Sequence, residues 1–157
     1  MNPVDLQVRR GKEADLGRVL EIERASFPHP WPEAHFLPYL RRGDCLVAGD
    51  RGEVVGFLIA TTDSEGRGAH LMNLAVLPRA RRQGVASRLL TTLASNCRQS
   101  GLGTLRLEVR AGNRAAIALY TRHGFTTVRR IPNFYGSGQD AVLMEKTLGG
   151  AAWGELH

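Results

Sequence analysis

Apolar residues along this chain recur at two spacings, every second position in some stretches and every third or fourth position in others. The first spacing is typical of a half-buried strand and the second of an amphipathic helix. The stretches predicted as strands are Leu6–Arg9, Cys45–Gly49, Val54–Thr62, Ala69–Val76, Thr104–Val109, Thr126–Ile131 and Ala141–Lys146. The stretches predicted as helices are Glu13–Ser26, Pro32–Leu40, Gly84 to Gly101, and Arg114–Arg122. Strands and helices are therefore expected to alternate over most of the chain.

The connections between these elements predict how the sheet is ordered. Asp50-Arg51-Gly52 is a short glycine-containing link that favours a hairpin, so the strands on either side of it open an antiparallel meander. From Ala69 to Val109 a strand, a helix and a strand follow one another, which favours parallel pairing and a right-handed crossover. We expect an α/β fold with a mixed sheet of six to seven strands, antiparallel in its first half, with a parallel central pair and about four helices.

The stretch Arg81-Arg82-Gln83-Gly84-Val85-Ala86 lies between a predicted strand and a predicted helix. Pro78 ends the strand because it cannot donate to a sheet ladder, and the helix begins at Gly84. The first N–H groups of a helix lack partners within it, and the helix dipole is positive there, so this end favours an anion. Nearby positive charge comes from Arg79, Arg81, Arg82 and Arg88. The pattern favours a pyrophosphate site, and the alternative is an ordinary glycine turn beside solvated arginines.

Composition limits the class of protein. The chain has 157 residues, of which 43% are hydrophobic and 23% charged, as expected for one folded domain rather than a disordered chain. We expect that domain to span residues 1–148 and residues 149–157 to form a flexible tail. No apolar run approaches the roughly 20 residues of a membrane span. The N-terminus has no secretory pattern, so we expect a cytoplasmic protein without a membrane partner.

Charge and cysteine content limit which partners, cofactors and metals the sequence favours. The net charge is +6, but the arginines are spread along the chain and are not interleaved with exposed aromatic residues. This spread disfavours nucleic acid as a partner and fits an anionic cofactor with a generally basic surface. Cys45 and Cys97 occupy apolar positions, which favours two reduced core thiols over a disulfide or a metal pair, and we predict no metal site.

Three groups of residues follow one another on consecutive predicted elements. They are the turn from Arg81 to Ala86, the strand Leu107-Glu108-Val109-Arg110, and a helix that begins at Asn113 and continues through Ala118-Leu119-Tyr120 to His123-Gly124-Phe125. Together they resemble the GNAT family, the acetyl-CoA-dependent N-acetyltransferases, whose pyrophosphate signature is Gln/Arg-x-x-Gly-x-Gly/Ala. The resemblance covers nearly the whole chain and implies that acetyl-CoA is the co-substrate.

Within that family the chain is most similar to the N-terminal-amine branch typified by the RimI ribosomal-protein alanine acetyltransferases. Further residues that carry this similarity are Phe27, Pro30-Trp31, Phe36, Asn133-Phe134-Tyr135 and Asp140-Ala141. The usual late pattern has two tyrosines where Phe134-Tyr135 stands, so one substrate-facing hydroxyl is missing. The resemblance implies acetylation of the N-terminal α-amine of a protein such as a ribosomal protein, and we expect a monomer or a homodimer.

The resemblance also implies roles in a direct attack of a neutral amine on the thioester. Glu108 is the general base, acting through a water, and Tyr120 is the acid that protonates the CoA thiolate. The N–H of Val76 polarises the acetyl oxygen. The implied cofactor-binding residues are Leu74, Ala75, Val76, Arg81, Arg82, Gln83, Gly84, Val85, Ala86, Ser87, Asn113 and Tyr120. The implied substrate-binding residues are Phe27, Pro28, His29, Asn73, Glu108 and Tyr135.

Alternatives remain for the residues and for the function. Glu108 can pair with Arg106 or Arg110 on a solvated strand face. Tyr120 can be a core aromatic residue and Asn113 a helix cap. The alternative functions are acetylation of a small-molecule amine or a lysine side chain, and a non-catalytic CoA-binding or ribosome-binding module. Reference pKa values of about 7.8 for an α-amine and about 10.4 for lysine make the neutral α-amine a few hundred times more abundant at pH 7, which favours an N-terminal acceptor.

Overall fold

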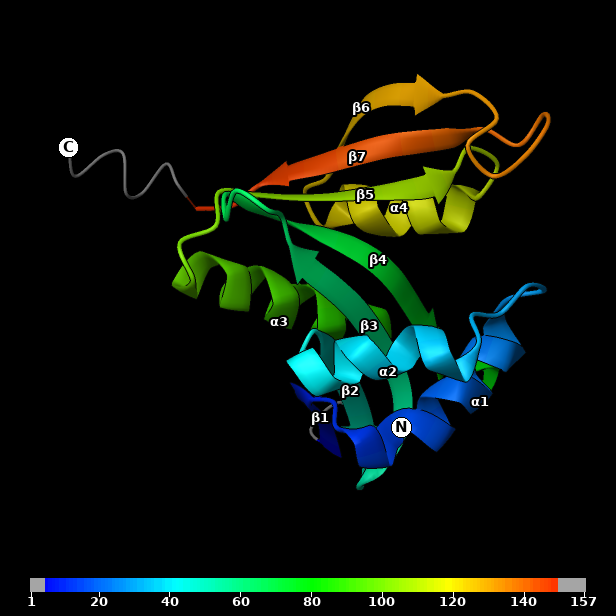
Figure 1. Ribbon diagram of the computed structural model, residues 1–157, viewed down its shortest axis with the longest axis vertical. Helices are drawn as coiled ribbons and strands as arrows, with labels where there is room; N and C mark the ends of the chain where they lie inside the picture. The colour runs from blue at the N-terminus through cyan, green and yellow to red at the C-terminus, as the bar shows by residue number, and fades with distance from the viewer. Residues whose placement is uncertain (1–4, 150–157) are drawn as a thin grey trace. The chain divides into compact units, whose positions relative to one another are not determined.

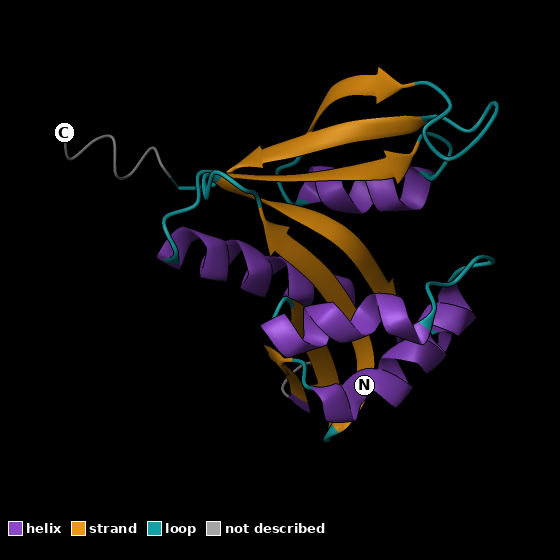
Figure 2. Cartoon of the chain, viewed as in Figure 1, coloured by secondary structure: helices purple, strands orange, loops and turns teal. Residues whose placement is uncertain are grey.

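The computed structural model describes residues 5–149, so residues 150–157 of the predicted tail lie outside it. The strands are β1 (Leu6–Arg10), β2 (Cys45–Asp50), β3 (Glu53–Thr62), β4 (Gly68–Val76), β5 (Thr104–Arg110), β6 (Thr126–Ile131) and β7 (Ala141–Thr147). The α-helices are α1 (Leu16–Ser26), α2 (Glu33–Arg42), α3 (Val85–Gln99) and α4 (Arg114–Arg122), and the short 3-10 helices are η2 (Glu13–Asp15) and η3 (Pro78–Ala80). Figures 1 and 2 show these elements along the chain.

The seven strands form one mixed sheet in the order β1-β2-β3-β4-β5-β7-β6. β1 with β2, β2 with β3, β5 with β7 and β6 with β7 pair antiparallel. β4 and β5 pair in parallel from Gly68 with Thr104 to His70 with Arg106. The mixed α/β fold predicted from the sequence, with its parallel central pair, is therefore confirmed.

The described residues form two compact units. Unit 1 comprises the chain up to Ala60 together with Asn73–Leu93, and unit 2 comprises Thr61–Met72 together with the chain from Ala94. Three elements, β3, β4 and α3, each contribute residues to both units. Each unit has its own group of buried apolar residues.

Helices α1 and α2 and strands β2 and β3 contribute equally to the buried hydrophobic cluster of unit 1, and Ala75 of β4 completes it. Phe36 of α2 and Phe57 of β3 are both fully buried and meet edge to face, with ring centroids 5.6 Å apart. Burying a large apolar side chain contributes about 1.5–3 kcal/mol. Cys45 lies in this core, where burial raises its pKa to about 12 and keeps the thiol protonated. Both cysteines are free and buried, as the sequence predicts.

The core of unit 2 follows from the alternation of residues along β5. Leu105, Leu107 and Val109 are buried, while the residues between them are half-buried or exposed. Met144 of β7 lies opposite Leu107 and is buried with it. One face of β5 is therefore apolar, and Glu108 projects from the other.

The N-terminal helix differs from its prediction. Instead of one helix from Glu13, the chain forms a 3-10 turn and then α1. The carboxylate of Asp15 accepts a 2.8 Å hydrogen bond from the backbone N–H of Lys12 and pairs with Arg9, which tightens this first turn. Local side-chain bonds of this kind compete with regular helix, which explains the difference.

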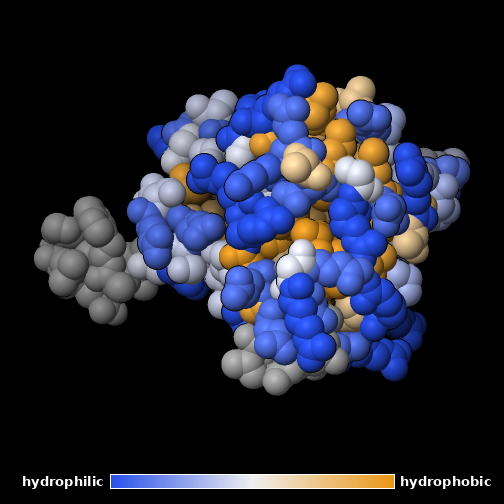
Figure 3. Space-filling model, turned by 90° about the horizontal axis from the view of Figure 1, so that it is seen from below, coloured by the Kyte–Doolittle hydropathy of each residue, from blue (hydrophilic) through white to orange (hydrophobic). Residues whose placement is uncertain are grey.

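Hydrophilic residues predominate on the face of the molecule that Figure 3 shows, and hydrophobic residues gather there in smaller patches. Among the described residues, no helix has both the length and the apolar character that crossing a membrane requires.

A glycine in β3 fixes how closely the first turn of α3 approaches the sheet. A Cβ at Gly56 would lie 2.9 Å from Cγ1 of Val85 and 3.2 Å from the carbonyl oxygen of Ala75. These are closer contacts than a packed side chain makes, so Val85 occupies the space that a side chain would need. The start of α3 is therefore held against β3 and the end of β4, all within unit 1.

Replacing this glycine tests that packing. Overpacking a core typically costs about 1–3 kcal/mol, so we expect Gly56→Ala to lower the free energy of unfolding by that amount. Gly17→Ala is the control, because a Cβ there meets nothing within 4 Å and Gly17 lies in α1. This control should gain about 0.5–1 kcal/mol. Chemical denaturation measures both, and equal stabilities for the two variants would contradict the close packing of α3 on Gly56.

Candidate active site

The turn that the sequence singles out has the backbone of an anion-binding loop. Arg82 and Gly84 adopt left-handed conformations, with φ of 62° and 81°. The N–H of Arg88 bonds to the carbonyl oxygen of Gly84 at 3.0 Å, so the N–H groups of the three residues between them belong to the first turn of α3. A Cβ at Gly84 would meet nothing within 4 Å, so space is open beside this backbone. Left-handed residues beside a helix N-terminus form a concavity that favours an anion.

Several arginines around this turn have structural partners. Arg81 donates from Nε to the carbonyl oxygen of Val76 at 3.0 Å and from Nη2 to Oγ of Ser26 at 3.3 Å. Arg79 forms an ion pair with Glu53. Arg81 therefore ties the turn to the last residues of β4 and α1. The backbone of the turn, rather than the side chains of Arg79 and Arg81, is therefore arranged to bind an anion.

A buried carboxylate holds the loop that follows α1. Glu23 is 1% exposed, and its Oε2 accepts the backbone N–H of Trp31 at 2.8 Å. Its Oε1 accepts Nδ2 of Asn73 at 2.8 Å, which links α1 to β4. The sequence analysis did not select Glu23 as a site residue. The sequence feature that could have indicated its role is a charged residue at a core position of an amphipathic helix.

The same loop carries the predicted acceptor-binding residues of unit 1. Phe27 is half-buried and packs against the core of unit 1, while Pro28 and His29 are exposed. Trp31 also packs against this core, with its ring centroid 5.2 Å from that of Phe36. The loop is therefore anchored at both ends and presents its middle to solvent.

In unit 2, Glu108 pairs with a residue that sequence reasoning did not select. Nε2 of His70, on β4, lies 2.7 Å from Oε1 of Glu108. The two side chains are 26% and 18% exposed. The sequence alternative paired Glu108 with Arg106 or Arg110, and the contact in the structure is with His70 instead. The available signal was the position of His70 and Glu108 on strands predicted to be parallel neighbours.

Tyr135 lies near this pair, on the loop between β6 and β7. Burial raises the pKa of Tyr135, and the negative charge of Glu108 raises it further. The guanidinium of Arg110 lies 4.3 Å from the centroid of the Tyr135 ring, a cation–π contact. Arg110 also donates to Oε1 of Gln139 at 2.6 Å, which joins the loop to β5. The structure thus places Glu108, Tyr135 and His70 near one another.

Asn113 precedes α4 and caps it, as its structural alternative has it, whereas Tyr120 on α4 is half-buried and not part of the core. Burial raises the pKa of Tyr120 to about 12, with a smaller contribution from Tyr135. Its ring meets Phe125 edge to face at 5.7 Å. Oδ1 of Asn113 accepts the N–H of Ala116 at 3.1 Å and so caps α4. These contacts fix both residues and leave their predicted catalytic and cofactor roles as proposals.

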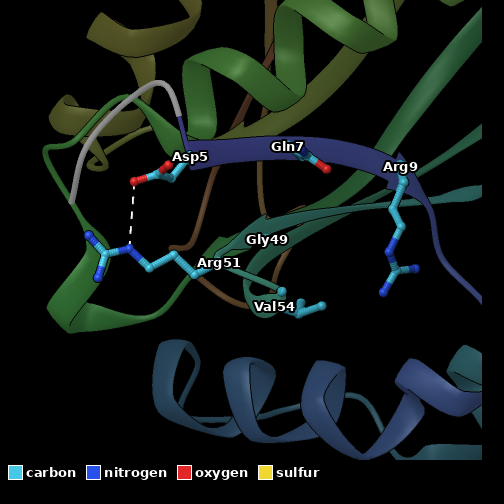
Figure 4. Close-up of a pocket in the computed structure, with 7 residues that line it drawn as sticks. Asp5, Gln7, Arg9, Gly49, Arg51 and Val54 are labelled. Carbon is cyan, nitrogen blue, oxygen red and sulfur yellow. Dashed lines mark ion pairs between the residues drawn. The ribbon is translucent and has the colours of Figure 1, made fainter.

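A separate hollow of about 250 Å³ lies in unit 1, lined by residues of the N-terminal segment and of the hairpin between β2 and β3. Figure 4 shows Asp5 and Arg51 forming an ion pair across it, at 3.5 Å, and the side chain of Arg9 at its other end. None of the residues predicted for the site lines this hollow. The hollow is therefore not part of the predicted active site.

The chain is similar to acetyltransferases in both sequence and structure. The sequence profile of the Acetyltransferase (GNAT) family matches residues 16–125. The N-alpha-acetyltransferase of Saccharolobus solfataricus is 29% identical, over 92% of this chain and 94% of that protein. The ribosomal protein bS18-alanine N-acetyltransferase of Haemophilus ducreyi is 36% identical, over 84% of this chain and 93% of that protein. The crystal structure of Ard1 from Thermoplasma volcanium matches with a TM-score of 0.86 and 30% identity, over 92% of this chain and 98% of that one.

The mixed sheet with its parallel central pair, the glycine turn between β4 and α3, and these matches together identify the acetyltransferase class. The chain belongs to the GNAT acetyltransferase family and is an N-acetyltransferase enzyme.

The buried Glu23 gives a stability prediction for this site. Glu23→Leu keeps a similar volume but leaves the Trp31 N–H and the Asn73 amide without their acceptor. Each unsatisfied buried group costs about 1–3 kcal/mol, so we expect the free energy of unfolding to fall by roughly 2–5 kcal/mol. Glu21→Leu on the same helix is the matched control, since Glu21 is 61% exposed and such changes stay within about 0.5 kcal/mol. Thermal and urea unfolding compare the two, and a similar loss in both would exclude the anchoring role.

Proposed function

We propose that this enzyme acetylates the N-terminal α-amine of a protein and that a ribosomal protein is its acceptor. Two relatives support the proposal by name, one an N-alpha-acetyltransferase and the other a ribosomal protein bS18-alanine N-acetyltransferase. The observation that carries it in this chain is the half-buried carboxylate of Glu108 beside Tyr135. A ribosomal-protein acceptor would place the reaction in the cytoplasm.

Acetyl-CoA is the co-substrate. We assign its pyrophosphate to the turn from Arg81 to Ala86, because the left-handed Gly84 leaves open space beside the first N–H groups of α3. We assign polarisation of the acetyl oxygen to the N–H of Val76, the last residue of β4. The amide of Asn113 is proposed to bind the pantetheine arm, through its nitrogen, since its oxygen caps α4.

The proposed reaction is a direct transfer. Glu108 accepts a proton from the α-ammonium group through a water, and the neutral amine then attacks the thioester carbon. The C–N bond forms, the C–S bond breaks, and the thiolate leaves with the electron pair of that bond. Tyr120 protonates the thiolate, and the second proton that the nitrogen loses as the amide forms restores the proton of Tyr120. Because its pKa is about 12, Tyr120 holds its proton throughout the neutral range and can donate it.

The acceptor is proposed to bind at the loop after α1 and at Tyr135. Phe27, Pro28 and His29 lie where the loop is anchored by Glu23 and open to solvent. The amide nitrogen of Asn73 is bound to Glu23, which leaves its oxygen as the group assigned to the acceptor. An α-amine suits this site better than a lysine. Its ammonium form has a lower pKa, so a single carboxylate removes its proton more readily.

Replacing the proposed base tests the mechanism. General-base catalysis contributes roughly 100-fold to 10,000-fold, so we expect Glu108→Gln to lower kcat at least 100-fold. Binding of acetyl-CoA, measured by calorimetry, should stay close to wild type. Glu145→Gln is the matched control, because Glu145 lies opposite Arg106 on the neighbouring strand β7. Unchanged turnover by the Glu108→Gln variant would remove Glu108 from the mechanism.

The raised pKa of Tyr120 gives a pH prediction. A general acid works in its protonated form, so its contribution is present below its pKa and lost above it. With a pKa of about 12, ionisation of Tyr120 should cause no loss of kcat up to about pH 10. Tyr120→Phe should lower kcat over that whole range without adding a new basic limb. A basic limb near pH 8–9 that disappears in the phenylalanine variant would contradict this assignment.

Two matched peptides test the acceptor class. One begins with alanine and carries a free α-amine, and the other has the same sequence with a blocked N-terminus and one internal lysine. We expect the first to be acetylated, with the position read by tandem mass spectrometry, and the second to remain unmodified. Acetylation of the lysine peptide alone would favour a lysine or small-molecule acetyltransferase and overturn the proposal.

A further inference from the structure

The buried carboxylate of Glu23 carries a charge that anchoring alone does not require. Its side chain is 1% exposed and accepts two hydrogen bonds of 2.8 Å, from the N–H of Trp31 and from Nδ2 of Asn73. Both donors are neutral, and within residues 5–149 no ion pair includes Glu23. Burying a charge without an opposite charge beside it is costly. A neutral acceptor would hold Trp31 at a lower cost, so the charge is expected to serve a second purpose.

That purpose is found in the direction of the Asn73 amide. A side-chain amide has an acceptor oxygen on one arm and a donor nitrogen on the other, whereas a carboxylate offers acceptors only. Beside Glu23, the nitrogen of Asn73 must therefore face the carboxylate, as it does in the structure. The oxygen of the amide then points away from Glu23.

This oxygen lies next to the loop proposed to bind the acceptor. The amide of Asn73 and the N–H of Trp31 are bonded to the same carboxylate, so Asn73 lies beside the loop that follows α1. Asn73 is half-buried and belongs to unit 1, as the loop does. An α-ammonium group has N–H donors and no acceptor, so it binds an oxygen at this place and is repelled by an N–H.

We propose that Glu23 is a positioning residue that holds the oxygen of Asn73 toward the acceptor, so that the site selects a group that donates hydrogen bonds. The proposal rests on the proposed function, in which that group is the α-ammonium of a protein. Glu23 touches neither substrate and acts through Asn73. Its charge is what makes the direction of the amide unambiguous.

Replacing Glu23 by glutamine should invert the amide of Asn73. The backbone N–H of Trp31 can only donate, so the glutamine oxygen faces Trp31 and the glutamine nitrogen faces Asn73. Asn73 then turns Oδ1 to that nitrogen and presents Nδ2 to the acceptor. Each buried donor keeps an acceptor, so we expect Glu23→Gln to lose less stability than Glu23→Leu.

A second substitution should restore the acceptor site. Asn73→Asp, made together with Glu23→Gln, supplies two acceptor oxygens, one for the glutamine nitrogen and one for the α-ammonium group. Calorimetry measures binding of the alanine-initiated peptide to enzyme saturated with CoA, and steady-state kinetics give KM and kcat. Glu21→Gln is the matched control, since Glu21 lies on the same helix and is 61% exposed.

We expect Glu23→Gln to weaken peptide binding and to raise its KM by roughly 10-fold to 100-fold, as for a lost hydrogen bond to a charged group. The value of kcat should change much less, because the lost contact is made in the ground state as well as in the transition state. The double variant should recover most of the lost affinity, and Glu21→Gln should bind as wild type does.

Hydrogen exchange of the Asn73 side chain reports the direction of its amide without any turnover. Its NMR signal is identified by its loss in the Asn73→Asp variant. In wild type one N–H of this amide is bound to a buried carboxylate, so its exchange with deuterium should be slow. In Glu23→Gln the same group faces the acceptor site and should exchange at least about 10-fold faster. This readout separates inversion of the amide from a mere loss of negative charge.

The positioning role is overturned if Glu23→Gln binds the peptide as tightly as wild type, or if the Asn73 amide still exchanges slowly in that variant. A double variant that binds no better than Glu23→Gln also overturns it. If Glu23→Gln does not fold, the double variant decides, because every donor in it faces an acceptor, and failure of both to fold contradicts the proposal. Failure of the proposed function looks different, since wild type would then neither bind nor acetylate the peptide.

Discussion

The proposed proton transfer at Glu108 and the proposed binding of acceptor and cofactor both depend on contacts made by strand β4. At its start, the missing side chain of Gly68 lets β4 approach β5, and His70 two residues later reaches Glu108. Further along the same strand, Asn73 binds the buried carboxylate of Glu23. The strand ends at Val76, whose carbonyl oxygen is held by Arg81 of the turn. The fixed spacing along a strand sets the distances between these three positions.

Glu23 and Glu108 show how the surroundings of a carboxylate separate a structural role from a chemical one. Both oxygens of Glu23 accept hydrogen bonds from protein donors and its side chain is buried, so it anchors the loop after α1 to β4. Glu108 remains 18% exposed, and only its Oε1 contacts a protein side chain, that of His70, among the contacts described here. A carboxylate in that setting can exchange a proton with water, as a general base must.

Much of the fold was predictable from local patterns, whereas the contacts of the site were not. The seven strands follow from alternation and from Gly and Pro at their ends, and the hairpin follows from Arg51-Gly52, whose left-handed conformations fit a two-residue turn. The pairing of His70 with Glu108 depends on the register of two strands separated by a whole helix, which local periodicity does not encode. The part played by Glu23 depends on a donor eight residues along the chain and another on β4.

One peptide that carries both a free α-amine and an internal lysine provides the most direct test of an N-terminal acceptor. The enzyme is supplied with isotopically labelled acetyl-CoA at pH 7, and tandem mass spectrometry measures the initial rate at each amine. We predict acetylation of the α-amine over lysine by a factor of a few hundred or more, as the difference in neutral amine requires. Equal rates at the two amines, or preference for the lysine, would contradict an N-terminal acceptor.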